Sequence, residues 1–106
     1  MRSVEGVLRE ELERLREAKR SYEEQIRKLP KGSIQQKKIK KHLYPYLAVR
    51  KTGKVVYQYL GRMPEKNLAA LRKGLEQRRR YEGMLREVQQ NIVRVEKMIR
   101  GKGRSV

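Results

Sequence analysis

The chain has 106 residues, which is enough for one small domain that buries only about two thirds of its unfolded surface. It carries 29 Lys and Arg against 12 Asp and Glu, a net charge of +17, with 37% hydrophobic residues and neither Phe nor Trp. These totals exclude a thick globular core and favour long exposed helices with a narrow apolar seam. An excess of positive charge this large destabilises a small fold by self-repulsion, so we expect a polyanionic partner.

Cysteine is absent and His42 is the single histidine, which excludes disulfides, thiolate chemistry and ordinary zinc sites. No apolar run approaches the ~20 residues that a helix needs to cross a bilayer, and the first residues form no apolar signal core. We therefore expect a soluble cytoplasmic protein without membrane contact. Association with the nucleoid or with a ribonucleoprotein is compatible with this location. No cofactor is expected.

Residues 1–29 predict a helix, because their apolar residues recur at spacings of three or four. These positions are Val4, Leu8, Leu12, Leu15, Ala18, Tyr22, Ile26 and Leu29. The segment is nearly neutral, with 8 basic and 7 acidic side chains. Several glutamates precede a base by four residues, the orientation that stabilises a helix: Glu5 and Arg9, Glu10 and Arg14, Glu23 and Arg27, Glu24 and Lys28. Pro30 and Gly32 end the helix.

Residues 30–63 form a basic segment with strand chemistry, since they hold 9 Lys and Arg, no Asp or Glu, and many β-branched and aromatic residues. We expect strands at residues 34–40, 44–50 and 54–60, joined by residues 41–43 and 51–53. Pro45 has no N–H to donate, so the second strand should carry a gap or bulge there, or turn that position away from a neighbour.

The register of the last two strands depends on their turn. A two-residue turn at Thr52 and Gly53 gathers Tyr44, Tyr46, Tyr57 and Tyr59 on one face and Leu47, Val49, Val56 and Leu60 on the other, whereas a three-residue turn with a glycine bulge splits the tyrosines. The apolar face favours the first option, and the reluctance of Thr52 to adopt a left-handed conformation favours the second. In either case we expect at least two of the tyrosines to pack on the helix ends with their hydroxyls at the rim.

Residues 64–100 predict a second helix that begins with Pro64 and Glu65, residues suited to a helix start. Its apolar stripe is Leu68, Leu71, Leu75, Leu85, Val88, Ile92, Val95 and Ile99. The interior glycines Gly74 and Gly83 mark a bend or a close contact, or they result from neutral sequence drift and have no structural role. Gly101 should close the helix, which leaves residues 101–106 as a short basic tail.

The expected fold is a single α+β domain over residues 1–106. Two long antiparallel helices, roughly 40 and 55 Å in length, pair like a coiled coil and are joined by a small three-stranded antiparallel sheet at one end. The thin seam makes a protein partner or a second copy, bound through the helices, a plausible addition.

The motif LPKGSI, KKIK, Tyr44 and Tyr46 with Leu47, Gly53-Lys54-Val55 and Tyr59-Leu60-Gly61 resembles that of a family of small uncharacterised bacterial and archaeal proteins. It covers about the middle third of the chain, and similar basic hairpins occur in some insertion-sequence transposases. The resemblance implies the order of elements and a mobile-element or nucleic-acid setting. It supplies no activity. Members of the wider set often carry a cysteine cluster that this chain lacks, and Pro45 replaces a central tyrosine.

The candidate nucleic-acid-binding residues combine cations with interleaved tyrosines. They are Lys31, Lys37, Lys38, Lys40, Lys41, Tyr44, Tyr46, Arg50, Lys51, Lys54, Tyr57, Tyr59, Arg72, Lys73, Arg78, Arg79 and Arg80. The lysines of the first strand suit phosphate contact, although lysines also protect edge strands from aggregation. The arginines of the second helix suit an extension of this surface, although they also suit a solvated helix face. His42 is interpreted as a bystander.

These features predict a non-enzymatic nucleic-acid-binding protein that recognises mainly the phosphate backbone. DNA is favoured over RNA because of the transposase-like hairpin. No nucleophile lies beside a base in a catalytic arrangement, and no metal-ligand spacing is present. The alternative is a coiled-coil adaptor subunit that binds a partner protein such as a nuclease or recombinase, and the balanced charge of the first helix fits it.

Overall fold

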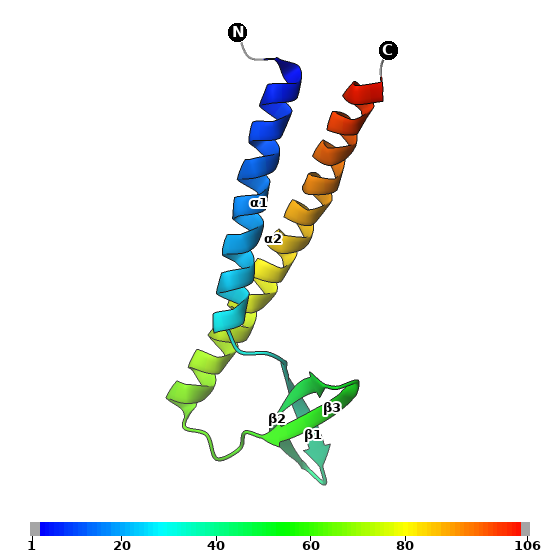
Figure 1. Cartoon of the computed structure of the whole chain (residues 1–106). Helices are drawn as coiled ribbons and strands as arrows, with labels where there is room; N and C mark the ends of the chain where they lie inside the picture. Colours follow the sequence, from blue (N-terminus) through cyan, green and yellow to red (C-terminus); the bar gives the residue numbers. More distant parts are fainter. Residues whose placement is uncertain (1–2, 105–106) are drawn as a thin grey trace. The chain divides into compact units, whose positions relative to one another are not determined.

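The computed structural model describes residues 3–104 of the chain. Its elements, in order, are α1 (Val4–Lys28), β1 (Ser33–Ile39), β2 (His42–Lys51), β3 (Lys54–Tyr59) and α2 (Glu65–Arg104) (Figure 1). The predicted α+β class, with two helices and a three-stranded antiparallel sheet between them, is confirmed. The residues form two compact units, a helical unit within residues 3–28 and 80–104 and a sheet unit of residues 29–79.

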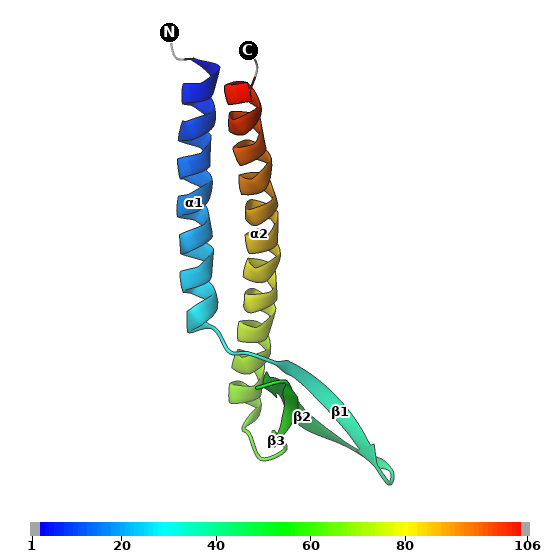
Figure 2. The same ribbon diagram turned by 45° about the vertical axis from the view of Figure 1, so that its right-hand side comes forward.

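In the helical unit, α1 and the C-terminal part of α2 run antiparallel, side by side (Figure 2). Their seam contains buried Leu12, Leu15, Val88 and Val95, with partly buried Leu8, Ala18, Tyr22, Ile92 and Ile99 packed against them. The predicted apolar stripes therefore do meet along this pair. Val4 is the exception, because its side chain is 58% exposed.

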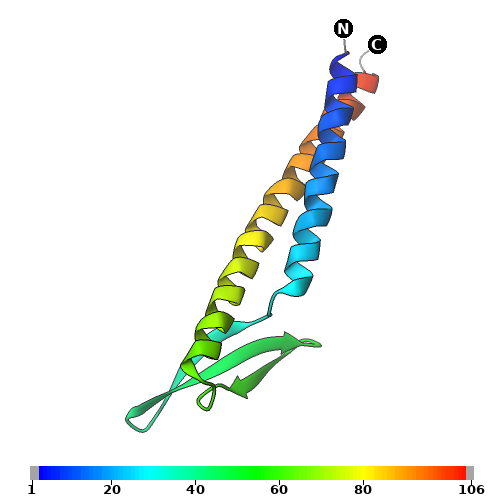
Figure 3. The ribbon, with the colours of Figure 1, turned by 90° about the vertical axis from the view of Figure 1, so that its left-hand side faces the viewer.

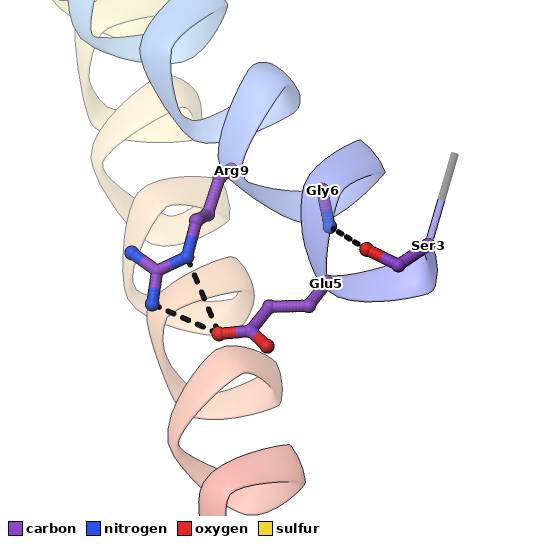
Figure 4. A network of polar contacts seen from close by, with 4 residues as sticks. All are labelled: Ser3, Glu5, Gly6 and Arg9. Atoms are coloured by element: carbon purple, nitrogen blue, oxygen red, sulfur yellow. Dashed lines mark hydrogen bonds and ion pairs between the residues drawn. The ribbon is translucent and has the colours of Figure 1, made fainter. Parts of the chain in front are cut away.

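The start of α1 is fixed by Ser3, which lies immediately before the first helical residue. The Ser3 hydroxyl oxygen accepts a hydrogen bond of 3.0 Å from the backbone N–H of Gly6 (Figure 4). The Ser3 carbonyl oxygen accepts one from the backbone N–H of Val7. Ser3 is thus an N-cap that satisfies one of the free N–H groups at the helix start. One turn on, Arg9 donates to the Glu5 carboxylate at 2.9 Å, as the spacing predicts.

Ion pairs continue along the exposed surface of α1. Glu24 contacts Lys28, four residues later, as predicted. Arg14 and Arg27, however, contact Glu11 and Glu24, which precede them by three residues. Spacings of three and of four residues both bring side chains together on a helix, so a glutamate at either distance can form an ion pair with the arginine.

The sheet has the order β1-β2-β3, and both of its hairpins have two-residue turns. Lys51 pairs with Lys54 across the second turn, which confirms the register that gathers the four tyrosines on one face. Thr52 adopts a φ of +47° and Gly53 a φ of +79°. Two positive φ values are typical of the hairpin turn that matches strand twist, so Thr52 accepts the left-handed conformation that it was expected to resist.

The first hairpin turns earlier than predicted. Ile39 pairs with His42, so the turn consists of Lys40 and Lys41 in place of residues 41–43, and β2 begins at His42. Lys40 has a φ of +59°, a left-handed value that lysine adopts at a cost. Pairing continues past Pro45, whose carbonyl accepts a hydrogen bond of 2.9 Å from Leu60 just beyond the end of β3.

One face of the sheet, here called the core face, packs on the first turns of α2 (Figure 3). The cluster contains buried Leu47, Leu60, Leu68 and Leu75, with partly buried Ile34, Val49, Met63 and Leu71. Side chains alternate between the two faces of a strand, so residues next to Leu47 point away from α2. The core face therefore fixes which face of the sheet is open.

Two glycines of the sheet unit occupy places that a side chain could not. Gly32 has a φ of +113°, and a Cβ there would lie 2.6 Å from the carbonyl oxygen of Ala48. Gly74 lies against the Pro30 ring, which a Cβ would meet at 2.8 Å. Of the three alternatives given for Gly74 from the sequence, the close contact is the one observed.

The ends of α2 differ from the prediction by a few residues. The helix begins at Glu65, and the Pro64 carbonyl accepts hydrogen bonds from Asn67 and Leu68. It continues through Gly101 to Arg104, so the predicted helix end at Gly101 is wrong. Residues 1–2 and 105–106, which the prediction placed in the first helix and the tail, lie outside the described residues.

Candidate nucleic-acid interface

The face of the sheet opposite the core face gathers most of the aromatic side chains of the chain. This tyrosine face carries Lys37 from β1, His42, Tyr44, Tyr46 and Arg50 from β2, and Tyr57 and Tyr59 from β3. The gathering follows from the register, because directly opposed residues share a face: Lys37 with Tyr44, Tyr46 with Tyr59, Arg50 with Val55. All three strands therefore contribute to one surface.

The rings on this face form a continuous strip. The centroid of the Tyr59 ring lies 5.3 Å from that of Tyr46 and 6.3 Å from that of Tyr44. The strip continues from Tyr44 to His42, whose ring is nearly edge-on at 6.4 Å. These separations are typical of favourable tilted and edge-to-face pairs, so the rings support one another in fixed orientations.

Lys37 places a positive charge within the strip. Its ammonium nitrogen lies 3.7 Å from the centroid of the Tyr57 ring and 5.1 Å from that of Tyr46. A cation over an exposed aromatic ring gains only about 0.5 to 1 kcal/mol, so the lysine is held in place but is easily released. Lys37 can therefore exchange its ring contact for a stronger contact with an anion.

The tyrosines are surface residues to a greater degree than predicted. Tyr57 and Tyr59 are 45% and 46% exposed, and Tyr44 and Tyr46 are half-buried. Within the described residues of the sheet unit, the cluster that packs on α2 includes no tyrosine. The prediction that at least two of them pack on the helix ends is wrong, because leucines occupy that position.

Tyr59 is held more firmly than its exposure suggests. A Cβ built on Gly61 would lie 1.9 Å from the Tyr59 hydroxyl oxygen and 2.1 Å from Cζ, the nearest atom of the ring. The ring thus lies directly over the Gly61 backbone, in space that any larger residue would fill. The Tyr-Leu-Gly sequence therefore fixes the orientation of the central ring of the strip.

The remaining cations of the basic segment surround this face and extend beyond it. Lys40 and Lys41 form the β1–β2 turn, and Lys51 and Lys54 flank the β2–β3 turn. Lys31 precedes β1, while Lys38 lies on the side of the core face, opposite Leu43. All six are exposed. The predicted lysines of β1 therefore divide between the two faces, and Lys37 alone joins the tyrosines.

The predicted arginines of α2 also divide into groups. Arg72 and Arg79, two helical turns apart, line a groove with Ser33 and Gln36 of β1. Arg78 is half-buried and donates a hydrogen bond of 3.0 Å to the carbonyl oxygen of Leu29, which gives it a structural role. Lys73 is exposed in the same stretch, and Arg80 belongs to the helical unit.

The electrostatic field of the sheet unit is strongly positive. Residues 29–79 hold 14 Lys and Arg and 2 Glu, a net charge of +12, and no acidic residue occurs between Leu29 and Pro64. Cations in that segment cannot neutralise one another, so the region attracts anions at long range and at low ionic strength.

The register also brings to the tyrosine face His42, which the sequence analysis interpreted as a bystander, and Gln35, which it did not consider and which is opposite Tyr46. Both positions follow from the alternation of side chains along a strand once Lys40 and Lys41 are known to form the turn. The turn expected from the sequence lay at residues 41–43, so these two positions were not found. Among residues 3–104, no group of three His, Asp or Glu side chains could hold a metal ion.

Comparisons with models of known protein families, with curated proteins and with solved structures gave no match. In the described part of the chain, neither helix is apolar enough over a sufficient length to cross a bilayer.

Proposed function

We propose that this chain is a non-enzymatic nucleic-acid-binding protein whose tyrosine face and surrounding lysines form the interface. The single observation that carries the proposal is the strip of solvent-accessible, mutually oriented rings that contains Lys37 and is bordered by Lys40 and Lys41. Aromatic rings on an open sheet face, together with cations that track a phosphate backbone, are the two parts of a nucleic-acid-binding surface.

Affinity on this surface comes mainly from phosphate contacts. The sheet unit carries a net charge of +12, and each phosphate neutralised by a lysine releases condensed counterions. Arg72 and Arg79, which line the groove with β1, extend the basic surface of the same unit. DNA is favoured over RNA, and a mobile-element setting is proposed, on the resemblance to transposase hairpins.

The test is charge reversal at the first hairpin. Replacement of Lys37, Lys38, Lys40 and Lys41 by Glu should lower the affinity for a fluorescent DNA by more than about 100-fold at low salt, because phosphate contacts dominate binding. Fluorescence anisotropy measures the affinity, and circular dichroism checks that the helices are retained.

The matched control reverses four exposed cations of the helical unit, Arg86, Arg94, Lys97 and Arg100, which changes the net charge by the same amount. If binding depends on the sheet, this control should retain most of the affinity. Equal loss in the two variants would mean that net charge alone drives binding. Full binding by the hairpin variant would refute the proposed interface.

A second candidate function is the coiled-coil adaptor, which exposed apolar residues of the helical unit favour. Val4, Val7, Val93 and Met98 are each 47% or more exposed, so the helices offer contact area to a protein partner or a second copy. Failure of the purified chain to bind any nucleic acid at low salt would make this function the better one.

A further inference from the structure

A groove at one end of the tyrosine face differs from the rest of the sheet unit in its chemistry. Its walls combine rings of the strip with apolar side chains from the β1–β2 hairpin and from the start of α2. They include His42, Leu43, Tyr44, Tyr59, Met63 and Leu68. The groove is open to solvent and spans about 400 Å³. It therefore offers aromatic and aliphatic side chains together with polar groups at the edge of a highly basic surface.

The groove does not suit a phosphate. Although the sheet unit is rich in cations, no Lys or Arg lies among the described residues that line the groove, and Glu65 contributes a carboxylate. That carboxylate lies 3.5 Å from the Arg72 guanidinium, so a cation is near it but belongs to another part of the surface. The occupant of the groove should accordingly be uncharged and planar.

We propose that this groove takes an unpaired nucleobase, an inference that rests on the proposed nucleic-acid binding and narrows it to single-stranded segments. The base stacks on the Tyr44 and Tyr59 rings, which lie 6.3 Å apart and tilted by 50°. Lys40 and Lys41, in the turn that precedes His42, hold the adjoining phosphates. In a paired duplex the faces of the bases are already stacked, so they are inaccessible to these rings.

The position of Tyr59 supports this assignment. Its ring lies over Gly61 and cannot turn into that backbone, so the groove wall is formed before a ligand arrives. Preorganised walls reduce the cost of ordering side chains on binding. The charged part of the surface is different, because Lys37 rests on Tyr57 and is free to move to a phosphate.

The experiment compares three probes of equal length, roughly 12 nucleotides, a size typical of small single-strand binders. The probes are oligothymidine, an abasic strand with the same phosphates, and a duplex. The expected result is that oligothymidine binds at least roughly tenfold more tightly than the abasic strand, because a stacked base contributes about that factor. It should also bind more tightly than the duplex. Equal affinity for oligothymidine and the abasic strand, or tighter duplex binding, would overturn the inference.

Two substitutions of the same kind locate the base. Tyr44→Val removes a ring of the groove and introduces a β-branched residue that also suits a strand, while Tyr57→Val does the same on the tyrosine face outside the groove. Tyr44→Val should lower the affinity for oligothymidine roughly tenfold and leave the affinity for the abasic strand unchanged. Tyr44→Phe, which keeps the ring, should bind oligothymidine as tightly as the native chain. An equal effect of Tyr57→Val would contradict a base held in the groove.

Tyrosine emission provides an independent readout, since the chain has six Tyr and no Trp. In a background with Tyr22→Phe and Tyr81→Phe, which lie in the helical unit, all emission comes from the tyrosine face. Stacking of a base should quench it with oligothymidine and leave it unchanged with the abasic strand. Failure of all three probes to bind would instead refute the proposed function itself, so the two failures are distinct.

Discussion

The helical unit and the sheet unit use charge in opposite ways. In the helical unit, 14 Lys and Arg stand against 10 Glu, and the ion pairs include Arg9 with Glu5, Arg14 with Glu11 and Arg16 with Glu96. In the sheet unit, 14 Lys and Arg stand against 2 Glu. This difference in charge balance is why the proposed nucleic-acid interface is assigned to the sheet unit.

The two units also differ in how they use tyrosine. Tyr22 and Tyr81 of the helical unit lie 6.1 Å apart, and Tyr22 packs against the apolar seam. The four tyrosines of the sheet unit face away from its core. The proposed nucleic-acid contact uses these outward-facing rings, whereas Tyr22 serves the packing of the helical unit.

The largest effect should come from the two buried clusters, which test whether the units are energetically separate. Leu75 is 2% exposed in the sheet unit and Leu15 is 4% exposed in the helical unit. Replacement of either by Ala should lower the free energy of unfolding by about 2 to 5 kcal/mol, the usual cost of a buried Leu-to-Ala cavity. Hydrogen exchange, followed by mass spectrometry, reports which amides each variant exposes.

If the units are separate, Leu75→Ala should speed exchange mainly in residues 33–59, and Leu15→Ala mainly in α1. Each variant serves as the control for the other, because residue type and substitution are identical. Similar acceleration in both regions by both variants would show that the two clusters unfold together. The units would then differ in charge but not in stability.

Much of this architecture could be predicted from sequence, because it depends on local patterns. Apolar spacing identified both helices, and β-branched and aromatic residues identified the three strands. The position of Gly101 near the C-terminus was misleading, since a Cβ there would meet nothing within 4 Å and the helix passes through it. A helix interior tolerates glycine at a cost of roughly 1 kcal/mol relative to alanine, so a glycine ends a helix only where other features also favour an end.

The interface was less predictable, because it depends on contacts between distant residues. Tyrosine suits either a core or a surface, and the packing of Leu60 and Leu75 on one face of the sheet decides between them. Arg78 looked like a cation for binding, but it donates a hydrogen bond to Leu29, 49 residues away. Neither relation leaves a signal in the neighbouring sequence.

A smaller effect should come from the turn residue Lys40, and it would sharpen the contrast between stability and binding. Lys40→Gly relieves a left-handed conformation that costs a non-glycine residue roughly 1 to 2 kcal/mol, while the added freedom of glycine in the unfolded chain offsets roughly 0.5 to 1 kcal/mol. The sheet should therefore become slightly more stable in urea. Binding should weaken, with a salt dependence reduced by about one phosphate contact.

Thr52→Gly is the matched control, because Thr52 has a φ of +47° in the other turn and carries no charge. It should stabilise the sheet similarly and leave binding unchanged. Should Lys40→Gly bind as tightly as the native chain, the β1–β2 turn would lie outside the interface.

The smallest effect concerns pH and the paired charges of the helical unit. A hydrogen bond from Arg14 lowers the pKa of the Glu11 carboxyl below its ordinary value of 4.5. Since the folded pKa lies below the unfolded one, the contribution of this pair to stability is complete above the unfolded pKa. It is lost as the pH falls through the folded pKa. Glu11→Gln should therefore flatten the acid side of the stability curve slightly, as measured by urea unfolding at several pH values.

The same titration separates the two units, because residues 30–63 of the sheet unit contain no carboxylate to protonate. In the Tyr22→Phe, Tyr81→Phe background, where all tyrosine emission comes from the tyrosine face, acid should weaken the helical unit before it changes that emission. A change in that emission at the same pH as the loss of helicity would mean that the ion pairs of α1 also support the sheet. The paired charges of the helical unit would then stabilise the unit that carries the excess of cations.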